Sequence, residues 1–342
     1  MRRARIDRGD ETSAPNEAEN TGKPPVPRNM KILLANPRGF CAGVNMAIDV
    51  VDQVLRLKGP PVFVFHEIVH NRHVVDGFRE RGVTFVDSMA EVPQGGLVVY
   101  SAHGVSPTIR SESKTRGLVE VDATCPLVTK VHLEVLRFAK DGYQILFIGH
   151  RKHDEAVGTV GEAPNHITVV ESPEEVANLQ VADPNKLAYV TQTTLSISDA
   201  SRIITALKAR FPNVKGPPKE DICYATTNRQ NAVAELGSEA DLVLVIGSKN
   251  SSNSQRLVER AHEMGKPAYL IDDQSELDQK WFDGVDTVMV TAGASAPEHL
   301  VQALIERLQR DFGGETELRT VVQEDVSFEP PRSLKRLAVL AS

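Results

Sequence analysis

Three stretches of similar pattern decide the fold of this chain: PVFVFHEIVHN at residues 61–71, QILFIGHRKHDE at residues 144–155 and DLVLVIGSKNSSN at residues 241–253. Each begins as a run of apolar, mostly β-branched or aliphatic residues and ends abruptly in polar ones. Short apolar runs of this kind are typical of buried strands in a parallel sheet, because both faces of such a strand are covered. We therefore predict three strands with polar residues at their carboxyl ends.

A cysteine precedes each run at nearly the same distance. The chain has three cysteines, Cys41, Cys125 and Cys223. The polar ends of the runs follow them after 28 or 29 residues, at His70, His153 and Ser251. Apolar residues recur at helical spacing directly after Cys41 and after Cys125, and Pro126 suits the first position of a helix. We expect a helix to begin just beyond each cysteine.

The repeat continues with a second set of strands. A short strand is predicted in each copy, at residues 83–88, 167–172 and 268–273, and each copy then closes on a second strand with a polar end, at residues 97–106, 187–196 and 287–297. The predicted fold class is α/β, with three similar units of mainly parallel sheet in a pseudo-threefold, trefoil-like arrangement around a central metal cluster. The predicted division is a disordered N-terminal tail at 1–29, units at 30–120, 121–215 and 216–312, and a C-terminal tail at 313–342 that packs on the body.

Composition narrows the classes of partner. The 342 residues are 41% hydrophobic and 25% charged, with a formal net charge of −7. This composition is ordinary for a globular protein and provides no global positive field for nucleic acid or an anionic membrane. No stretch approaches the roughly 20 apolar residues of a membrane span. Three widely spaced cysteines do not form a secreted disulfide framework, so we expect a cytoplasmic protein that binds small molecules or proteins.

The equivalent positions of the cysteines favour a metal site. If the three units pack around a common axis, Cys41, Cys125 and Cys223 meet at its centre, each at the positive end of a helix, which lowers the pKa of a thiol. Taken singly, each cysteine is better explained as a small buried apolar residue, but the shared position in all three repeats favours the metal site. Zinc with a histidine and an iron-sulfur cluster with one iron free of protein thiolate both fit three thiolates. Because structural zinc usually uses closely spaced cysteine pairs, and because polar residues surround the site, the cluster is favoured.

The polar strand ends predict a substrate pocket. Imidazole, hydroxyl and amide groups gather there and suit a phosphate or diphosphate, although the chain has no GxxxxGK[ST] or GxGxxG loop. Serine, threonine and asparagine at strand ends also serve as ordinary caps of turns and helices. The candidate residues are His70, His103, His153, Glu155, Thr193, Ser251, Ser252, Asn253 and Ser295. Glu155 is the candidate proton donor, placed in a loop, and Thr193 is expected to hydrogen-bond between Glu155 and the substrate.

Several motifs together resemble the 4-hydroxy-3-methylbut-2-enyl diphosphate reductase family. They are NPRGFCAG at 36–43, HNR at 70–72, SAHGVSP at 101–107, DATCP at 122–126, TQTTLS at 191–196, DICYATTNRQ at 221–230 and SSNS at 251–254. The resemblance covers about residues 31–334. It implies the last step of the non-mevalonate isoprenoid pathway, in which the allylic hydroxyl of the substrate is removed reductively to give isopentenyl and dimethylallyl diphosphates.

The resemblance also implies roles for individual residues. It implies one 4Fe-4S cluster per chain, held by Cys41, Cys125 and Cys223. It implies that the diphosphate is bound by His70, His103, Ser251, Ser252, Asn253 and Ser295. It implies that the substrate hydroxyl is bound, and the proton relay formed, by His153, Glu155, Thr193 and Thr194. The implied electron donor is reduced ferredoxin or flavodoxin.

Two other classes of protein share these residues. A zinc-dependent hydrolase built on the same cysteines and histidines would be colourless and stable in oxygen. A non-catalytic phosphometabolite-binding or redox-sensing protein would bind a ligand without consuming a reductant. Turnover that consumes a reductant would distinguish the reductase from the hydrolase and from the non-catalytic protein. The sequence leaves the oligomeric state open.

Overall fold

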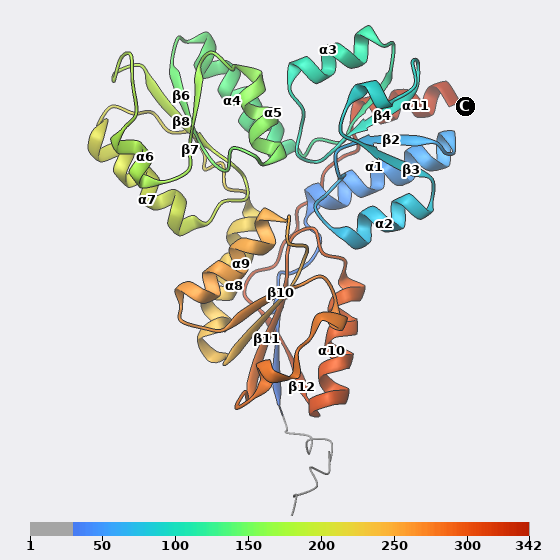
Figure 1. The fold of residues 1–342 in the computed structure, drawn as a ribbon, viewed down its shortest axis with the longest axis vertical. Coiled ribbons are helices and arrows are strands. Elements are labelled where there is room, and N and C mark those ends of the chain that lie inside the picture. The colour runs from blue at the N-terminus through green and yellow to red at the C-terminus, as the bar shows by residue number, and fades with distance from the viewer. Residues whose placement is uncertain (1–29, 342) are drawn as a thin grey trace, which may run out of the picture.

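Three α/β lobes surround a common centre in the computed structural model, which describes residues 30–341 (Figure 1). Every strand pairing among the described residues is parallel. The predicted fold class, with three parallel-sheet units in a trefoil-like arrangement, is confirmed. The tail predicted at residues 1–29 lies outside the described residues.

The first lobe has a four-stranded sheet in the order β3-β2-β4-β5. Its strands are β2 (Val62–Phe65), β3 (Val83–Val86), β4 (Leu97–Tyr100) and β5 (Val119–Asp122). Its helices are α1 (Ala42–Lys58), α2 (Arg72–Glu80) and α3 (Pro107–Thr115), with the short helix η1 (Met89–Glu91). Helix α11 (Arg332–Ala341) also packs on this lobe, where Leu334 and Leu337 join its core.

The second lobe has a three-stranded sheet in the order β7-β6-β8. Its strands are β6 (Gln144–Ile148), β7 (Ile167–Val170) and β8 (Leu187–Thr191). Its helices are α4 (Pro126–Lys140), α5 (Asp154–Glu162), α6 (Pro173–Ala177) and α7 (Ile197–Arg210). Helices α4 and α5 lie on one side of this lobe, and α6 and α7 lie on the other (Figure 1).

The third lobe has a five-stranded sheet in the order β10-β9-β11-β1-β12. Its strands are β1 (Lys31–Asn36), β9 (Leu242–Ile246), β10 (Ala268–Ile271), β11 (Thr287–Ala292) and β12 (Glu315–Thr320). Its helices are α8 (Tyr224–Leu236), α9 (Ser252–Glu263) and α10 (Glu298–Phe312). The short helices are η2 (Gly237–Glu239), η3 (Gln274–Glu276) and η4 (Gln279–Phe282).

The same three-strand arrangement recurs in every lobe. The strand from each quoted apolar run, β2, β6 or β9, lies between the short strand and the second polar-ended strand of its own repeat. Parallel strands end at the same edge of a sheet, so the polar ends of each pair lie side by side. The predicted internal repeat is therefore present as three structurally matched units.

Two strands lie in a different sheet from the one that the predicted division of the chain implies. Strand β1, expected at the start of the first unit, pairs with β11 and β12 in the third sheet. Strand β12, expected in the C-terminal tail, forms the edge of the same sheet. An apolar strand such as β1 is stabilised by burial on both faces. Its own sequence therefore does not determine which sheet it joins.

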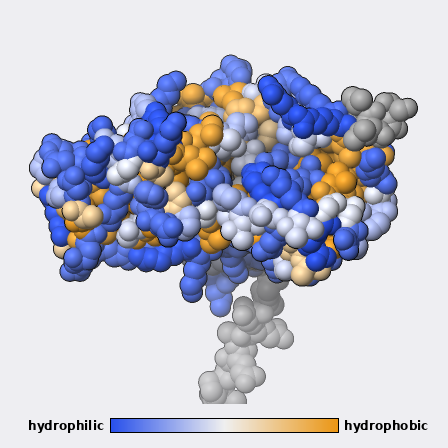
Figure 2. Space-filling model, turned by 90° about the horizontal axis from the view of Figure 1, so that it is seen from above, coloured by the Kyte–Doolittle hydropathy of each residue, from blue (hydrophilic) through white to orange (hydrophobic). Residues whose placement is uncertain are grey.

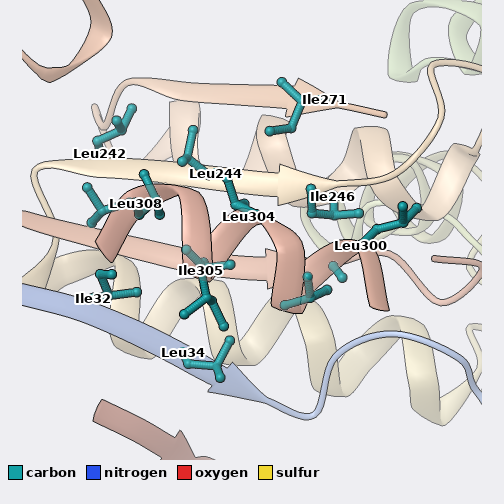
Figure 3. Close-up of a cluster of buried hydrophobic side chains, with 14 of the residues drawn as sticks. Ile32, Leu34, Leu242, Leu244, Ile246, Ile271, Leu300, Leu304, Ile305 and Leu308 are labelled. Carbon is teal, nitrogen blue, oxygen red and sulfur yellow. The ribbon is translucent and has the colours of Figure 1, made fainter. Parts of the chain in front are cut away.

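The core of the third lobe shows why β1 belongs there. Ile32 and Leu34 of β1 pack with Leu244 of β9 and with Leu304 and Ile305 of α10 (Figure 3). The side chains of Ile32 and Leu304 are completely buried. Burial of each such side chain contributes roughly 1.5–3 kcal/mol. This apolar contact therefore fastens the beginning of the described chain to its third unit.

The face of the molecule drawn in Figure 2 is mainly hydrophilic. Figure 2 shows one face on which apolar residues are scattered among polar ones. Large exposed apolar side chains include Leu133, which is 61% exposed, and Leu318, which is 58% exposed. Among the described residues, no helix combines the length and the apolar character that crossing a membrane requires.

Candidate active site

Each cysteine is the residue that caps the beginning of a helix. Cys41 precedes α1, Cys125 precedes α4 and Cys223 precedes α8. Cys223 also accepts a hydrogen bond at Sγ from the backbone N–H of Thr226, at 3.4 Å. The three predicted helix starts are thereby confirmed, and the three thiols line one cavity.

Gly43 lies close to the thiols of both Cys125 and Cys41. A Cβ atom built on Gly43 would lie 2.6 Å from Sγ of Cys125 and 4.0 Å from Sγ of Cys41. Real Cβ atoms do not approach another heavy atom to 2.6 Å, so a larger residue at position 43 would force the Cys125 side chain to move. Two of the thiols therefore lie close to this point of α1, as ligands of one metal group must.

Cys125 and Cys223 do not show the low pKa values that their helix positions predict. Burial raises the pKa of Cys125 to about 12, although the backbone N–H of Leu127 opposes this. Burial also raises the pKa of Cys223 to about 11, and the neighbouring Cys41 adds to the rise. The burial of the thiols outweighs the helix N-terminus in both cases. Because metal ligands must be deprotonated, metal binding at this site would release protons.

All the residues predicted for the site line the same cavity of about 100 Å³. They come from the polar ends of strands and the first turns of helices in all three lobes. They are Cys41, His70, His103, Cys125, His153, Glu155, Thr193, Thr194, Cys223, Ser251, Ser252, Asn253 and Ser295. The cavity therefore combines three thiols, three imidazoles, hydroxyl groups, an amide and one carboxyl group.

Glu155 is the buried carboxyl group of this cavity, with 1% of its surface exposed. It lies in the first turn of α5, not in a loop as predicted, because His153 caps that helix. Its Oε1 accepts the backbone N–H of Thr193 at 2.6 Å, and its Oε2 accepts the Thr193 hydroxyl at 2.8 Å. Burial raises the pKa of Glu155 to about 7, although both hydrogen bonds from Thr193 oppose the rise. A carboxyl group with this pKa can hold a proton near neutral pH and donate it.

Three histidines pack against one another in the cavity wall. The rings of His70 and His103 are stacked with their centroids 4.0 Å apart. The ring of His153 meets both edge-on, at 5.3 Å from His70 and 5.7 Å from His103. His103 and His70 follow adjacent strands of the first lobe, and His153 comes from the second. The cluster therefore joins two lobes at the cavity.

Hydroxyl and amide side chains connect the third lobe to the other two. Ser295 donates a hydrogen bond to the backbone oxygen of His70 at 2.9 Å, and its hydroxyl is 3.3 Å from that of Ser251. Ser252 donates to the backbone oxygen of Thr194 at 2.9 Å. Asn253 accepts the backbone N–H of Ala294 at 2.8 Å. These bonds hold the strand ends of three units in fixed positions around the cavity.

Thr226 is a cavity-lining residue that the sequence analysis did not select. Its hydroxyl lies 3.2 Å from Sγ of Cys223 and accepts a hydrogen bond from Asn253 at 3.3 Å. It therefore connects a thiol to the predicted diphosphate-binding residues. Its position three residues after a helix-capping cysteine is the sequence signal that could have identified it.

Fold and site together define a three-unit α/β protein with a thiol-lined polar pocket at its centre. A family model described as LytB protein matches residues 32–309. The 4-hydroxy-3-methylbut-2-enyl diphosphate reductase of Rhodopirellula baltica is 55% identical over 309 residues, which cover 90% of this chain and 97% of that protein. The enzyme of the same name from Klebsiella pneumoniae is 54% identical, with 90% and 98% covered. The chain belongs to the LytB protein family.

A solved structure agrees with this assignment. The E-1-hydroxy-2-methyl-but-2-enyl-4-diphosphate reductase from Plasmodium falciparum superposes with a TM-score of 0.89 at 39% identity, covering 91% of this chain and 99% of that chain. The sequence relationship therefore extends to the arrangement of all three lobes. The predicted membership of this family is confirmed.

Proposed function

We propose that this chain reductively removes the hydroxyl group of (E)-4-hydroxy-3-methylbut-2-enyl diphosphate and forms isopentenyl and dimethylallyl diphosphates. The observation that carries the proposal is the convergence of three thiols at helix N-termini and one buried carboxyl group on a single polar cavity. The names of the relatives support the choice of substrate.

The thiols are proposed to hold one 4Fe-4S cluster through Cys41, Cys125 and Cys223. Their convergence on one cavity, with Gly43 close to two of them, supports such a group. When bound, a cluster with three thiolate ligands supplies a Lewis-acidic iron without a protein ligand and a route for electrons. No closely spaced cysteine pair, such as structural zinc usually uses, occurs in the sequence.

The opposite wall of the cavity is proposed to bind the diphosphate. Hydroxyl, amide and imidazole groups are donors for phosphoryl oxygens, and the first turn of α9 adds backbone N–H groups at the positive end of that helix. The residues proposed for this role are His70, His103, Ser251, Ser252, Asn253 and Ser295. With the diphosphate fixed there, the hydroxyl end of the substrate is placed near the thiols and the carboxyl group.

Glu155 is proposed to protonate the leaving hydroxyl group, with Thr193, Thr194 and His153 orienting it. The two hydrogen bonds from Thr193 hold the Glu155 carboxyl group in one orientation, and burial keeps it protonated near neutral pH. Protonation lets the hydroxyl leave as water. The balanced reaction uses two electrons and two protons, one proton forming water and the other forming the new C–H bond.

The test of the proposal is turnover without oxygen. The full chain, purified and loaded without oxygen, is mixed with the substrate and reduced methyl viologen, and both products are measured. Formation of both diphosphates with two electrons consumed per product is expected, and reduced ferredoxin or flavodoxin is expected to replace the viologen. Binding of the substrate without consumption of reductant would refute the reductase and favour a binding protein.

A further inference from the structure

The third residue after each cysteine lines the cavity from the first turn of its helix. These residues are Val44 in α1, Val128 in α4 and Thr226 in α8. Valine and threonine have nearly the same shape, but threonine carries a hydroxyl group where valine has a methyl group. Of the three helices, only the one that follows Cys223 therefore presents a hydroxyl group at this position.

The Thr226 side chain is completely buried and lies against the sulfur of Cys223. Its Oγ1 is 3.2 Å from Sγ of Cys223, which is within hydrogen-bond distance for sulfur. The backbone N–H of Thr226 also donates to this sulfur, at 3.4 Å. Thr226 thus approaches one of the three sulfurs with two polar groups.

The amide group of Asn253 decides the direction of the hydroxyl hydrogen. The backbone N–H of Ala294 can only donate a hydrogen bond, so the Asn253 atom that faces it at 2.8 Å is Oδ1. The other amide atom is then Nδ2, which can only donate, and it lies 3.3 Å from Oγ1 of Thr226. The Thr226 oxygen therefore accepts a hydrogen bond from Asn253.

The single hydrogen of the Thr226 hydroxyl group is left for another acceptor. Within residues 30–341, this hydroxyl group makes hydrogen-bond contacts with the amide of Asn253 and the sulfur of Cys223. Because the amide offers only hydrogens at this point, the hydroxyl hydrogen is directed to the sulfur. A thiolate, which is the form that binds metal, has no hydrogen of its own and can only accept.

The same hydrogen bonds connect Cys223 with the backbone of a second cysteine. The backbone oxygen of Ala294 accepts the N–H of Cys41 at 3.1 Å, and its N–H holds Oδ1 of Asn253. Asn253 is therefore fixed by Ala294 on one side and by Thr226 on the other. An exchange of the two amide atoms would bring two donors together at Ala294, so the order of donors and acceptors is set.

We propose that Thr226 is a positioning residue whose hydroxyl group donates a hydrogen bond to the Cys223 thiolate and thereby makes the cluster held by the three cysteines easier to reduce. The inference rests on the proposed function, because it concerns the cluster that the thiolates are proposed to hold. An electron that enters a cluster adds negative charge, and a hydrogen bond to a ligating sulfur stabilises that charge. Removal of the hydroxyl group is therefore expected to lower the reduction potential.

The experiment measures the reduction potential of the cluster in the full chain, loaded and kept without oxygen. Thr226→Val, which gives α8 the residue that α1 and α4 have at this position, is compared with the parent chain. Reductant is added stepwise with redox mediators, and the reduced cluster is measured by EPR spectroscopy. We expect the equilibrium constant for one-electron reduction to fall by about tenfold, which corresponds to a potential about 59 mV lower.

Three further variants separate the loss of the hydroxyl group from other effects. Thr226→Ser keeps the hydroxyl group, and the potential of the parent chain is expected. Thr226→Ala removes it with a smaller side chain, and the same lower potential as in Thr226→Val is expected. Thr227→Val is the matched control, because it makes the same change at the next position of α8, outside the cavity lining, and is expected to keep the parent potential.

A merely structural role for Thr226 predicts a different result. If its hydroxyl group only holds Asn253 in place, Thr226→Val would bind inorganic diphosphate more weakly and would keep the potential of the parent chain. Calorimetry measures the dissociation constant of diphosphate for both chains. An unchanged potential in Thr226→Val would overturn the inference, and so would loss of the cluster from both Thr226→Val and Thr226→Ala.

Failure of the proposed function is recognised separately. A parent chain that carries no iron-sulfur cluster would refute the proposed function and the inference together. A parent chain that reduces the substrate, with an unchanged potential in Thr226→Val, would refute the inference alone. If the potential falls as expected but the substrate is not reduced, the role of Thr226 stands and the reaction is wrong.

Discussion

Glu155 and Thr193 form the closest polar contact between a helix and a strand end in the cavity, with both carboxylate oxygens accepting hydrogen bonds from one residue, at 2.6 Å and 2.8 Å. This arrangement opposes the effect of burial on the carboxyl group. Burial favours the protonated form, while the two bonds favour the ionised form, and the net result is a pKa of about 7. The proposed proton donor is thus balanced near neutral pH.

Replacement of Glu155 tests its role directly. Glu155→Gln removes the acidic proton but keeps the size of the side chain and its hydrogen bond from the Thr193 N–H. Turnover is expected to fall by about 100-fold or more, which is the lower range for loss of general acid catalysis. Iron content and substrate affinity are expected to remain. Glu112→Gln, on the exposed side of α3, is the control, and equal turnover in both variants would remove Glu155 from the mechanism.

The pH dependence of turnover follows from the same contact. A general acid must hold its proton, so the rate is expected to decline as the pH rises above the pKa of Glu155, about 7. Thr193→Val removes the hydroxyl bond that favours the ionised form. The pKa of Glu155 then rises further, and the decline is expected to begin at a higher pH than in the parent chain. A decline that stays in place or moves to lower pH would contradict this account.

Gly43 is expected to be required for binding of the metal group and not for the stability of helix α1. Alanine stabilises a helix interior by roughly 0.5–1 kcal/mol relative to glycine, but the added Cβ at position 43 would lie 2.6 Å from Sγ of Cys125. Gly43→Ala is therefore expected to lower the iron bound per chain. Gly77 in α2 has no atom within 4 Å of an added Cβ, so Gly77→Ala is the matched control with full iron content. Equal iron in both variants would show that the two sulfurs are free to move apart.

Arg229 and Glu324 fasten the C-terminal segment to the site. The side chain of Arg229 is 1% exposed, lies 3.0 Å from Glu324 and donates to the backbone oxygen of Gly39 at 2.8 Å. Glu324→Gln leaves this buried cation without its partner, which is expected to lower the free energy of unfolding by about 3–5 kcal/mol. Denaturant unfolding measures the change. Glu317→Gln, which breaks an exposed pair with Lys31, is expected to cost less than about 1 kcal/mol, and similar costs for both would refute the role of Arg229.

The sequence predicted the repeat because its signals are local. A cysteine, an amphipathic helix and an apolar strand with a polar end recur in the same order, and the strand ends at His70, His153 and Ser251 lie together in the structure. The lobe to which β1 belongs was not predictable, since a strand buried on both faces pairs equally well with several sheets. Strand β12 was missed because its residues, Glu315–Thr320, are mostly exposed and lack an apolar pattern.

The contacts of Asp154 with neighbouring histidines and the pKa values of the thiols also could not be predicted from the sequence. Asp154 lies between two predicted residues, but only the turn of α5 directs it toward His66 and His70 and away from the cavity. The low pKa predicted for the thiols was wrong for Cys125 and Cys223, because position at a helix end is visible in a sequence and the degree of burial is not. Local capping and strand patterns were therefore readable, whereas contacts between lobes and their electrostatic consequences required the structure.

Each cysteine is expected to be indispensable. Cys41→Ser, Cys125→Ser and Cys223→Ser each remove one of three converging thiols, and each is expected to lose iron and turnover together. Ser111→Ala, at an exposed position of α3, is the control and is expected to keep full iron and turnover. A cysteine variant that keeps full iron and full turnover would exclude that residue from the cluster.

The most direct test of the central proposal is the amount of iron and acid-labile sulfide per chain in protein purified without oxygen, with its visible absorption spectrum. We predict about four of each per chain and a brown colour, as a 4Fe-4S cluster held by three thiolates requires. Zinc without sulfide in a colourless protein would leave the fold and the cavity as described and would contradict the redox chemistry.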